Sequence, residues 1–282
     1  MERVSLQGDG VLLAADACGH TDDPPVIFLH GGGQTRASWS KAVRAVGMAG
    51  FRAISLDARG HGESGWAAPD DDYGLDRFVA DLAAVIDEIA VKPALVGASM
   101  GGLAALIYAG EIAPFAVDAL VLVDIAPRIE MKGASRIAAF MQDRPEGFAT
   151  LEEAADAVAA YLPDRPRPRD PKGLLKNLRQ TGDGRYHWHW DPRFGHNELS
   201  ESDMLTSNGR LEAAARNLVA PTLLLRGALS EVVSKQGVDD FLRLTPHAEY
   251  INVADADHMI AGDKNDVFNS AVVAFLQEQR VR

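Results

Sequence analysis

Short, mostly apolar runs divide the chain, and longer segments between them carry apolar residues every three or four positions. The runs lie at residues 26–29, 51–56, 94–98, 119–124 and 221–227. Runs of this length are typical of parallel strands that are buried on both faces. Residues 75–91 have the spacing of an amphipathic helix covering a sheet, with apolar side chains at Phe78, Leu82, Val85, Ile86 and Ile89. The pattern predicts an α/β protein with a largely parallel sheet.

The two ends of the chain add further strands. Residues 4–6 and 11–15 flank a Gly-Asp-Gly turn at 8–10, a pattern that predicts an N-terminal hairpin. Residues 249–253 form a last strand, and the segment after it carries apolar residues such as Val272 and Phe275 at helical spacing. We therefore expect the chain to begin with a hairpin and to end with a helix.

The middle of the chain differs in kind. From residue 128 to about residue 210 no short apolar run resembles a central strand, and amphipathic helical stretches occur at 135–141, 151–161 and 173–178. Residues 162–171 are rich in proline and arginine, and we interpret them as a stiff, solvated connector. We expect residues 1–127 and 211–282 to form one α/β core, and residues 128–210 to be an inserted, mostly helical cap.

Composition and charge exclude several classes of function. The 282 residues include 28 basic and 40 acidic side chains, a formal net charge of −12 that argues against nucleic acid and anionic membranes as partners. The single cysteine, Cys18, cannot form an internal disulfide or a cysteine metal site. The first residues lack the apolar core of a signal peptide, and no apolar run approaches the roughly 20 residues of a membrane helix. We expect a cytoplasmic enzyme.

The apolar run at 94–98 ends in Gly-Ala-Ser-Met-Gly at residues 97–101, and an alanine-rich, helix-forming segment follows. A strand that turns into a helix within one or two residues leaves little room for side chains. Gly97 and Gly101 are therefore expected where a Cβ would collide with neighbouring backbone. Ser99 would then stand at the tip of the turn, beside the N–H groups that begin the helix. The alternative is a glycine-rich turn that happens to hold a serine.

A second glycine-rich loop, His-Gly-Gly-Gly at residues 30–33, follows the strand at 26–29. Its amides are suited to binding an oxyanion, because only glycine lets backbone approach a substrate so closely; the alternative is a merely flexible loop. The loop at 57–64 combines Asp, Arg, His and Glu with glycines. We expect these charges to hold one another and the loop backbone, and we assign no catalytic role to Asp57 or His61.

The order of strand, His-Gly-Gly-Gly, strand, Asp-Ala-Arg-Gly-His-Gly-Glu-Ser, helix and Gly-Ala-Ser-Met-Gly-Gly resembles the α/β-hydrolase fold, specifically its serine esterase, lipase and cofactor-free perhydrolase branch. The resemblance implies a mostly parallel eight-stranded sheet flanked by helices, with an inserted helical cap. It also implies that the backbone N–H groups of Gly32 and Met100 form the oxyanion hole. Ser99 argues against the dehalogenases and epoxide hydrolases of similar shape, whose nucleophile is aspartate.

The same resemblance implies a catalytic triad in the order serine, acid, histidine. His258 lies on the loop after the last strand and is expected to be the general base. The acid is expected just past the strand at 221–227, where this chain has Glu231 in place of the usual aspartate; Asp124, which also follows a strand, is the competing position. A parallel sheet gathers the C-terminal ends of its strands along one edge, so Ser99, Glu231 and His258 can converge.

Aromatic side chains are the expected walls of a substrate pocket over the nucleophile. Trp188, Trp190 and Phe194 of the cap are placed there, although packing within the cap explains them equally well. Gly33 and Trp39 complete the expected pocket.

Together these residues predict ester hydrolysis through an acyl-enzyme, with a small-molecule ester as substrate and no cofactor. His187 and His189 have a spacing that can place two imidazoles on one metal, but no third ligand is identifiable and we expect no metal. Three alternatives stay open: perhydrolysis of the haloperoxidase type, hydrolysis of a carbon–carbon bond, and a receptor of this fold that binds a small molecule without turnover. The identity of the ester and the oligomeric state do not follow from the sequence.

Overall fold

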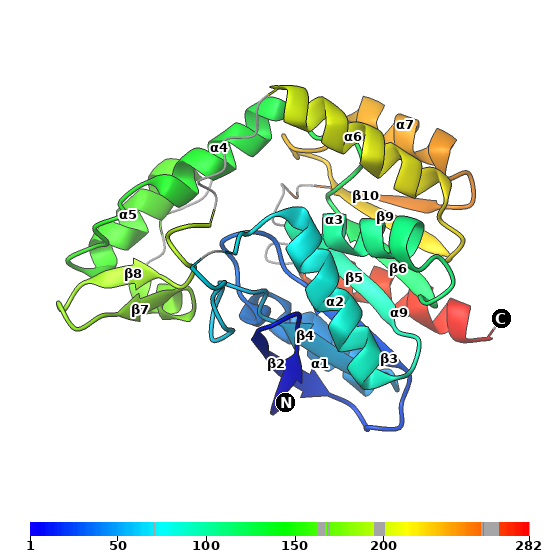
Figure 1. The fold of residues 1–282 in the computed structure, drawn as a ribbon, viewed down its shortest axis with the longest axis horizontal. Helices are drawn as coiled ribbons and strands as arrows, with labels where there is room; N and C mark the ends of the chain where they lie inside the picture. Colours follow the sequence, from blue (N-terminus) through cyan, green and yellow to red (C-terminus); the bar gives the residue numbers. More distant parts are fainter. Residues whose placement is uncertain are drawn as a thin grey trace.

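An eight-stranded sheet in the order β1-β2-β4-β3-β5-β6-β9-β10 forms the centre of the protein (Figure 1). The computed structural model describes residues 1–69, 71–162, 167, 170–194, 201–254, 256 and 265–281. The strands are β1 (Glu2–Gln7), β2 (Leu12–Cys18), β3 (Pro25–Leu29), β4 (Arg52–Leu56), β5 (Ala94–Ala98), β6 (Ala119–Val123), β9 (Thr222–Gly227) and β10 (Glu249–Val253). β2 is antiparallel to both of its neighbours, and the other neighbouring strands pair in parallel. The predicted mostly parallel sheet of eight strands is confirmed.

Alternating residues of the central strands pack on opposite faces of the sheet. In β3, Ile27 belongs to one cluster of buried side chains, whereas Val26 and Phe28 belong to the other. This is the two-residue period of a strand that is buried on both faces. One face is covered by α1 (Ser40–Met48) and α9 (Asn265–Val281), and the other by α2 (Leu75–Ile89), α3 (Met100–Ile107), α6 (Glu201–Arg216) and α7 (Lys235–Leu244).

Residues 128–210, called the cap below, contain α4 (Met131–Gln142), α5 (Leu151–Tyr161), a 3-10 turn η3 (Pro171–Lys176) and a small antiparallel sheet of β7 (Leu178–Gln180) and β8 (Tyr186–Trp188). α4, α5, β7 and β8 lie to one side of the main sheet (Figure 1). Their buried side chains form a separate cluster of Met141, Phe148, Ala154, Leu178, Trp188 and Trp190.

In the cap, the longer helices were predicted from the sequence, whereas the shorter elements differ from the prediction. The helical stretches expected at 135–141 and 151–161 are confirmed as α4 and α5. The stretch at 173–178 is a 3-10 turn followed by β7, because strands of three residues are too short to leave a periodic pattern. α6 runs across residue 210, and its later residues Leu211, Ala214 and Ala215 pack in the core.

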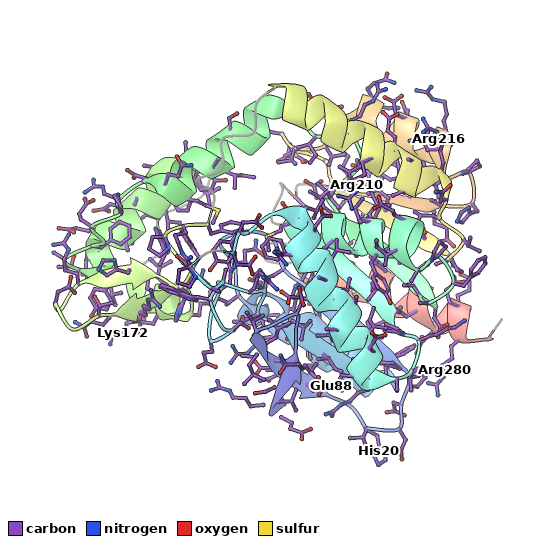
Figure 2. The ribbon with its side chains drawn as sticks, viewed as in Figure 1. His20, Glu88, Lys172, Arg210, Arg216 and Arg280 are labelled. Atoms are coloured by element: carbon purple, nitrogen blue, oxygen red, sulfur yellow. The ribbon has the colours of Figure 1, made fainter. Side chains whose placement is uncertain are left out.

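Polar and charged side chains such as His20, Lys172 and Arg280 lie on the outside of the molecule (Figure 2). Arg210 of α6 pairs there with Asp76 of α2 and with Glu111. Among the helices of the described ranges, none combines the length and the apolar character needed to cross a membrane.

Candidate active site

Ser99 occupies the turn between β5 and α3. β5 ends at Ala98 and α3 begins at Met100, so one residue reverses the chain. The backbone angles of Ser99, φ +47° and ψ −121°, lie in a region that residues other than glycine rarely adopt. Strain of this kind persists only where the surrounding structure fixes it, and it is concentrated at functional sites. The side chain of Ser99 is partly exposed.

The two glycines that flank this turn are required by close backbone contacts. A Cβ at Gly97 would lie 2.6 Å from the carbonyl oxygen of Gly101, and a Cβ at Gly101 would lie 2.5 Å from the carbonyl oxygen of Leu29. The N–H of Gly101 donates to the carbonyl of His30 at 3.2 Å. The expectation that Cβ atoms would collide here is confirmed, and the turn packs directly against the end of β3.

The loop at 30–33 therefore lies beside Ser99. A Cβ at Gly31 would lie 3.1 Å from Cβ and 3.8 Å from Oγ of Ser99. In the described part of the chain, the N–H groups of Gly32 and Met100 have no hydrogen-bond partner. For Met100 this follows from its place in the first turn of a helix, whose N–H groups lack intrahelical acceptors. Among the described residues, two backbone donors without partners thus lie on the segments that adjoin Ser99.

Two buried histidines hold this loop. His30 donates from Nδ1 to the carbonyl of Gly31 at 2.8 Å, and its Nε2 accepts the N–H of Ala58 at 3.0 Å. His61 donates from Nδ1 to the carbonyl of Arg59 at 3.0 Å, and its Nε2 accepts the N–H of Gly33 at 3.1 Å. Burial lowers the pKa of His30, and burial together with His30 lowers the pKa of His61 to about 3. Both rings are therefore neutral and each has one donor and one acceptor nitrogen.

The charges of the loop at 57–64 have structural partners, as expected, but their ion pairs are with residues outside the loop and not with one another. The carboxylate of Asp57 is fully buried and accepts the backbone N–H of Arg36 at 2.6 Å and that of Glu63 at 2.9 Å. The guanidinium of Arg36 also pairs with Asp57, and it reaches Glu63 at 2.6 Å. These contacts tie the loop to the segment that follows residues 30–33.

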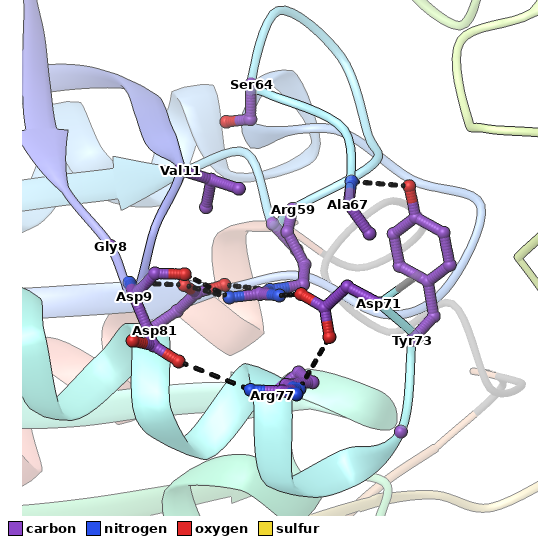
Figure 3. Close-up of polar contacts among 12 residues, drawn as sticks. Gly8, Asp9, Val11, Arg59, Ser64, Ala67, Asp71, Tyr73, Arg77 and Asp81 are labelled. Carbon is purple, nitrogen blue, oxygen red and sulfur yellow. Dashed lines mark hydrogen bonds and ion pairs between the residues drawn. The ribbon is translucent and has the colours of Figure 1, made fainter. Parts of the chain in front are cut away.

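Arg59 anchors the same loop from its other side (Figure 3). Its side chain is fully buried, with Nε 2.7 Å and Nη2 2.8 Å from the two carboxylate oxygens of Asp81 in α2. The guanidinium also donates to Asp71 at 3.0 Å and to the carbonyl of Asp9 at 2.8 Å. A bidentate pair with further acceptors satisfies a buried arginine and fixes its position.

Side chains of the cap cover the glycines at 32 and 33. Cβ atoms built on Gly32 and Gly33 would lie 3.2 Å from the Phe194 ring and 3.3 Å from the Trp190 ring, with Met141 also within 3.6 Å of both. Trp190 stacks on Trp188 with ring centroids 4.9 Å apart. Trp190 and Phe194 thus form a wall of aromatic rings over the loop. Trp188 stacks on Trp190 and packs with the buried side chains of the cap.

Trp39 lies away from this wall. Its side chain is 1% exposed and lies between Phe28 of β3 and Phe268 of α9, with centroid distances of 5.5 and 5.7 Å. This placement differs from the expected one in the substrate pocket. Trp39 follows the glycine loop closely in sequence, but the intervening turn carries it into the core beneath α9.

Asp191 and Arg193 attach the end of this wall to the core. Asp191 is 1% exposed and accepts the hydroxyl of Tyr73 at 2.6 Å, while its backbone N–H donates to the carbonyl of Gly60 at 2.7 Å. Arg193 pairs with Asp191 at 2.7 Å and donates to the carbonyl of Ala67 at 2.6 Å. Burial raises the pKa of Asp191, but hydrogen bonds from Arg193 and Tyr73 outweigh it and lower the pKa overall.

The two candidate acids have different surroundings. Asp124 follows β6, is fully buried with φ +49°, and accepts the N–H of Gly227 at 3.0 Å and the hydroxyl of Ser230 at 2.5 Å. Glu231 lies in the loop after β9, and its carboxylate is 50% exposed and pairs with Arg136 of α4 at 2.8 Å. His258, the expected base, lies outside the described residues.

His187 and His189 do not form a metal site with a third ligand in the described ranges, which contain no group of three or more histidine, cysteine or acidic side chains that could hold a metal ion. Instead, Nε2 of His187 lies 3.6 Å from the carboxylate of Asp183.

A family model described as alpha/beta hydrolase fold matches residues 24–264 of the chain. The chain belongs to this family. The match spans the strands from β3 to β10, the serine turn and the loop at 30–33, so the fold described above is that of an α/β hydrolase.

Relatives of this α/β hydrolase include esterases and lipases. It is 30% identical over 250 residues to an esterase of Mycobacterium tuberculosis, with 86% of this chain and 78% of the relative covered. It is also 30% identical over 263 residues to the sn-1-specific diacylglycerol lipase of Mus musculus, with 90% and 81% covered. The crystal structure of E-2-(acetamidomethylene)succinate hydrolase superposes with a TM-score of 0.83 at 22% identity and covers 98% of this chain and all 100% of its own, a likeness of fold.

Met141, Asp191 and Tyr73 were not among the residues that the sequence indicated. Their contacts join positions far apart in the chain: Tyr73 meets Asp191 across 118 residues, and Met141 meets Gly33 from a helix of the cap. No local pattern signals such a pairing. Asp191 directly follows two alternating tryptophans. Only its burial distinguishes it from a surface aspartate, and burial cannot be read from these neighbours.

Proposed function

We propose that this α/β hydrolase cleaves carboxylic esters through an acyl-enzyme formed on Ser99. The observation that carries the proposal is the strained serine turn, with the N–H groups of Gly32 and Met100 on the adjoining segments unpaired among the described residues. Backbone strain at a serine, together with backbone donors on the segments that adjoin it, fits a nucleophile and the oxyanion that it generates.

In the proposed reaction His258 takes the proton of the Ser99 hydroxyl while Oγ attacks the ester carbonyl carbon. The carbonyl oxygen becomes an oxyanion, which the N–H groups of Gly32 and Met100 bind. His258 then gives the proton to the leaving alcohol as the acyl-enzyme forms. A water molecule then attacks the carbonyl carbon of the acyl-enzyme while His258 takes its proton. His258 returns that proton to Oγ of Ser99 as the ester bond to the serine breaks, which releases the carboxylic acid and the free serine.

The triad acid has two candidates, Glu231 and Asp124. Glu231 occupies the loop that the family normally uses, but its carboxylate is half-exposed and paired with Arg136. Asp124 is buried at the end of β6, the strand next to the one that precedes Ser99, and two hydrogen bonds fix it. A buried, fixed carboxylate is better suited to orient an imidazole and stabilise its charged form. These contacts favour Asp124 as the acid.

The wall over the glycine loop favours a small-molecule ester with an apolar acyl or alcohol group. Met141, Trp190 and Phe194 contribute only sulfur, methyl carbon and aromatic carbon to the contacts with Gly32 and Gly33. Apolar lining with a few convergent polar groups is typical of small-molecule pockets. The esterase and the diacylglycerol lipase among the relatives act on esters according to their names, which agrees with this proposal.

The proposal is tested with a panel of p-nitrophenyl esters and a serine-reactive phosphonate. The parent protein should turn over esters many times and gain the mass of one phosphonate, and Ser99→Ala should do neither while keeping its fold by circular dichroism. Labelling of Ser99→Ala at the parent's rate would place the nucleophile elsewhere. Ligand binding with no more than one turnover would favour a receptor. Halogenation with peroxide, or cleavage of a carbon–carbon bond, at rates above ester hydrolysis would favour the chemistry of other relatives, which include a non-heme chloroperoxidase of Burkholderia pyrrocinia.

A further inference from the structure

We propose that His61 is a positioning residue for the oxyanion hole: its ring holds the Gly33 amide and thereby keeps the N–H of Gly32 directed at the reacting carbonyl. This inference rests on the proposed ester hydrolysis. His61 comes from the charged loop after β4 and has no contact with Ser99 in the described hydrogen bonds or ring contacts. It acts through the backbone of the glycine loop.

The argument begins with the peptide planes on either side of Gly32. A peptide group is planar, so a hydrogen bond to its oxygen or from its nitrogen fixes the direction of the opposite group as well. His30 binds the oxygen of the plane that carries the Gly32 N–H, and His61 accepts the N–H of the plane after it. Glycines have broad freedom in φ and ψ, and Gly33 has φ +72°. The carbonyl of Gly31 also accepts the N–H of Gln34 at 3.2 Å, so the two histidines and this turn bond together orient the Gly32 N–H.

The His61 ring is fixed from behind. Its Nδ1 donates to the carbonyl of Arg59, and Arg59 is held by the bidentate pair with Asp81 and by Asp71 and the carbonyl of Asp9 (Figure 3). The bond from Nδ1 places the ring proton on Nδ1 and leaves Nε2 free to accept from Gly33. A buried arginine network thus determines which nitrogen of His61 faces the glycine loop.

The ring is also fixed from the front. The Phe194 ring meets His61 edge to face, with centroids 4.6 Å apart and an interplanar angle of 76°. Phe194 in turn lies against Gly32. His61 is 1% exposed, so no water competes for its Nε2. Burial keeps the ring neutral, which is the form that can accept the Gly33 N–H.

Two substitutions separate the hydrogen bond from the packing. His61→Phe keeps an aromatic ring but removes the acceptor, and His61→Gln supplies an amide oxygen that can reach the position of Nε2. His247→Phe makes the same substitution at a histidine whose Nε2 donates to the carbonyl of Ala220, before the first residue of β9 and so at the opposite edge of the sheet. Active sites are counted by complete phosphonate labelling, so that kcat is expressed per active molecule and is not affected by a misfolded fraction.

We expect His61→Phe to lower kcat per active site by about 10–100-fold with KM nearly unchanged, because a displaced donor weakens binding of the transition state more than of the substrate. His61→Gln should recover most of the loss, and His247→Phe should match the parent. An unchanged kcat in His61→Phe, or equal losses in the Phe and Gln variants, would overturn the inference.

A second measurement does not depend on activity. Hydrogen exchange followed by mass spectrometry should show the peptide spanning residues 30–36 protected in the parent and His61→Gln, and faster to exchange in His61→Phe. Equal exchange in the parent and His61→Phe would disprove the role of His61 even if the protein hydrolyses no ester. Conversely, a parent that neither hydrolyses esters nor reacts with the phosphonate would refute the proposed function, while the exchange result still decides whether His61 holds the loop.

Discussion

The carboxylate of Asp124 lies 2.5 Å from the hydroxyl of Ser230 and joins the end of β6 to the loop after β9. The same hydroxyl accepts the backbone N–H groups of Val232 and Val233, so the loop folds around it. Glu231, the next residue after Ser230, turns outward to Arg136. The loop after β9 therefore holds a buried carboxylate at the end of β6, which is the acid under the proposed function.

This relationship predicts different effects for two isosteric substitutions. Asp124→Asn should lower kcat by several orders of magnitude, about 10⁴-fold, because the charge that stabilises the imidazolium is removed. Glu231→Gln should stay within a few-fold of the parent, since it alters only an exposed ion pair. Steady-state kinetics with one p-nitrophenyl ester compare the two. If the reverse pattern is found, Glu231 is the acid.

The wall over the glycine loop predicts that two neighbouring tryptophans differ in role. Trp190→Ala should lower kcat/KM more for long acyl chains than for acetate, by about 1–3 kcal/mol of apolar contact. Trp188→Ala should mainly lower the free energy of unfolding, by about 3–5 kcal/mol, because Trp188 packs with Phe140 and Phe148 inside the cap. Ester-chain profiles and urea unfolding measure both. Equal losses across chain lengths in Trp190→Ala would assign it to cap packing alone.

The close packing of the serine turn predicts that adding one methyl group at Gly101 strongly destabilises the fold. Gly101→Ala places a Cβ 2.5 Å from the Leu29 carbonyl oxygen, and backbone on both sides cannot move apart without breaking the contact between β3 and α3. We expect the free energy of unfolding to fall by about 3 kcal/mol or more. Gly182→Ala is the control, because a Cβ there meets nothing within 4 Å. Similar unfolding midpoints for the two variants would show that the turn can accommodate a Cβ at residue 101.

The buried neutral His61 predicts a pH dependence of stability. Its pKa is about 3 in the folded protein, whereas an unfolded chain titrates near the ordinary value of about 6.5. Between these values the unfolded chain binds one more proton than the folded one, so this group lowers the free energy of unfolding by up to about 1.4 kcal/mol for each pH unit below 6.5. His61→Gln removes the term. The parent should therefore lose stability more steeply than the variant on acidification, as measured by urea unfolding; parallel slopes would contradict the buried, neutral ring.

Much of the fold was predictable because its signals are local. The apolar run at 94–98, the glycines around Ser99 and the helical spacing at 75–91, which is α2 over Leu75–Ile89, each depend on contacts within a few residues or on burial of a whole strand. The small strands β7 and β8 carried no such signal, since three residues are too few to show a period.

The parts of the site that could be predicted were those that lie in a recognisable sequence motif. Ser99 and the loop at 30–33 lie next to each other as expected, because both follow the C-terminal ends of neighbouring strands. Trp39 and Glu231 could not be placed from the sequence, since the direction of a side chain at the end of a short turn depends on packing partners that are distant in the chain, such as Phe268 and Arg136. Asp191 was missed for the same reason.

Asp191 and Arg193 limit how much of the cap can be replaced by the corresponding segment of a relative. These residues belong to the cap as defined above, yet they bind the Tyr73 hydroxyl and the carbonyls of Gly60 and Ala67, which lie outside it. Gly60 neighbours His61, so a chimaera that replaces the segment through residue 194 also removes a support of the glycine loop. A graft intended to change only substrate choice should therefore end before residue 190 and leave this attachment in place.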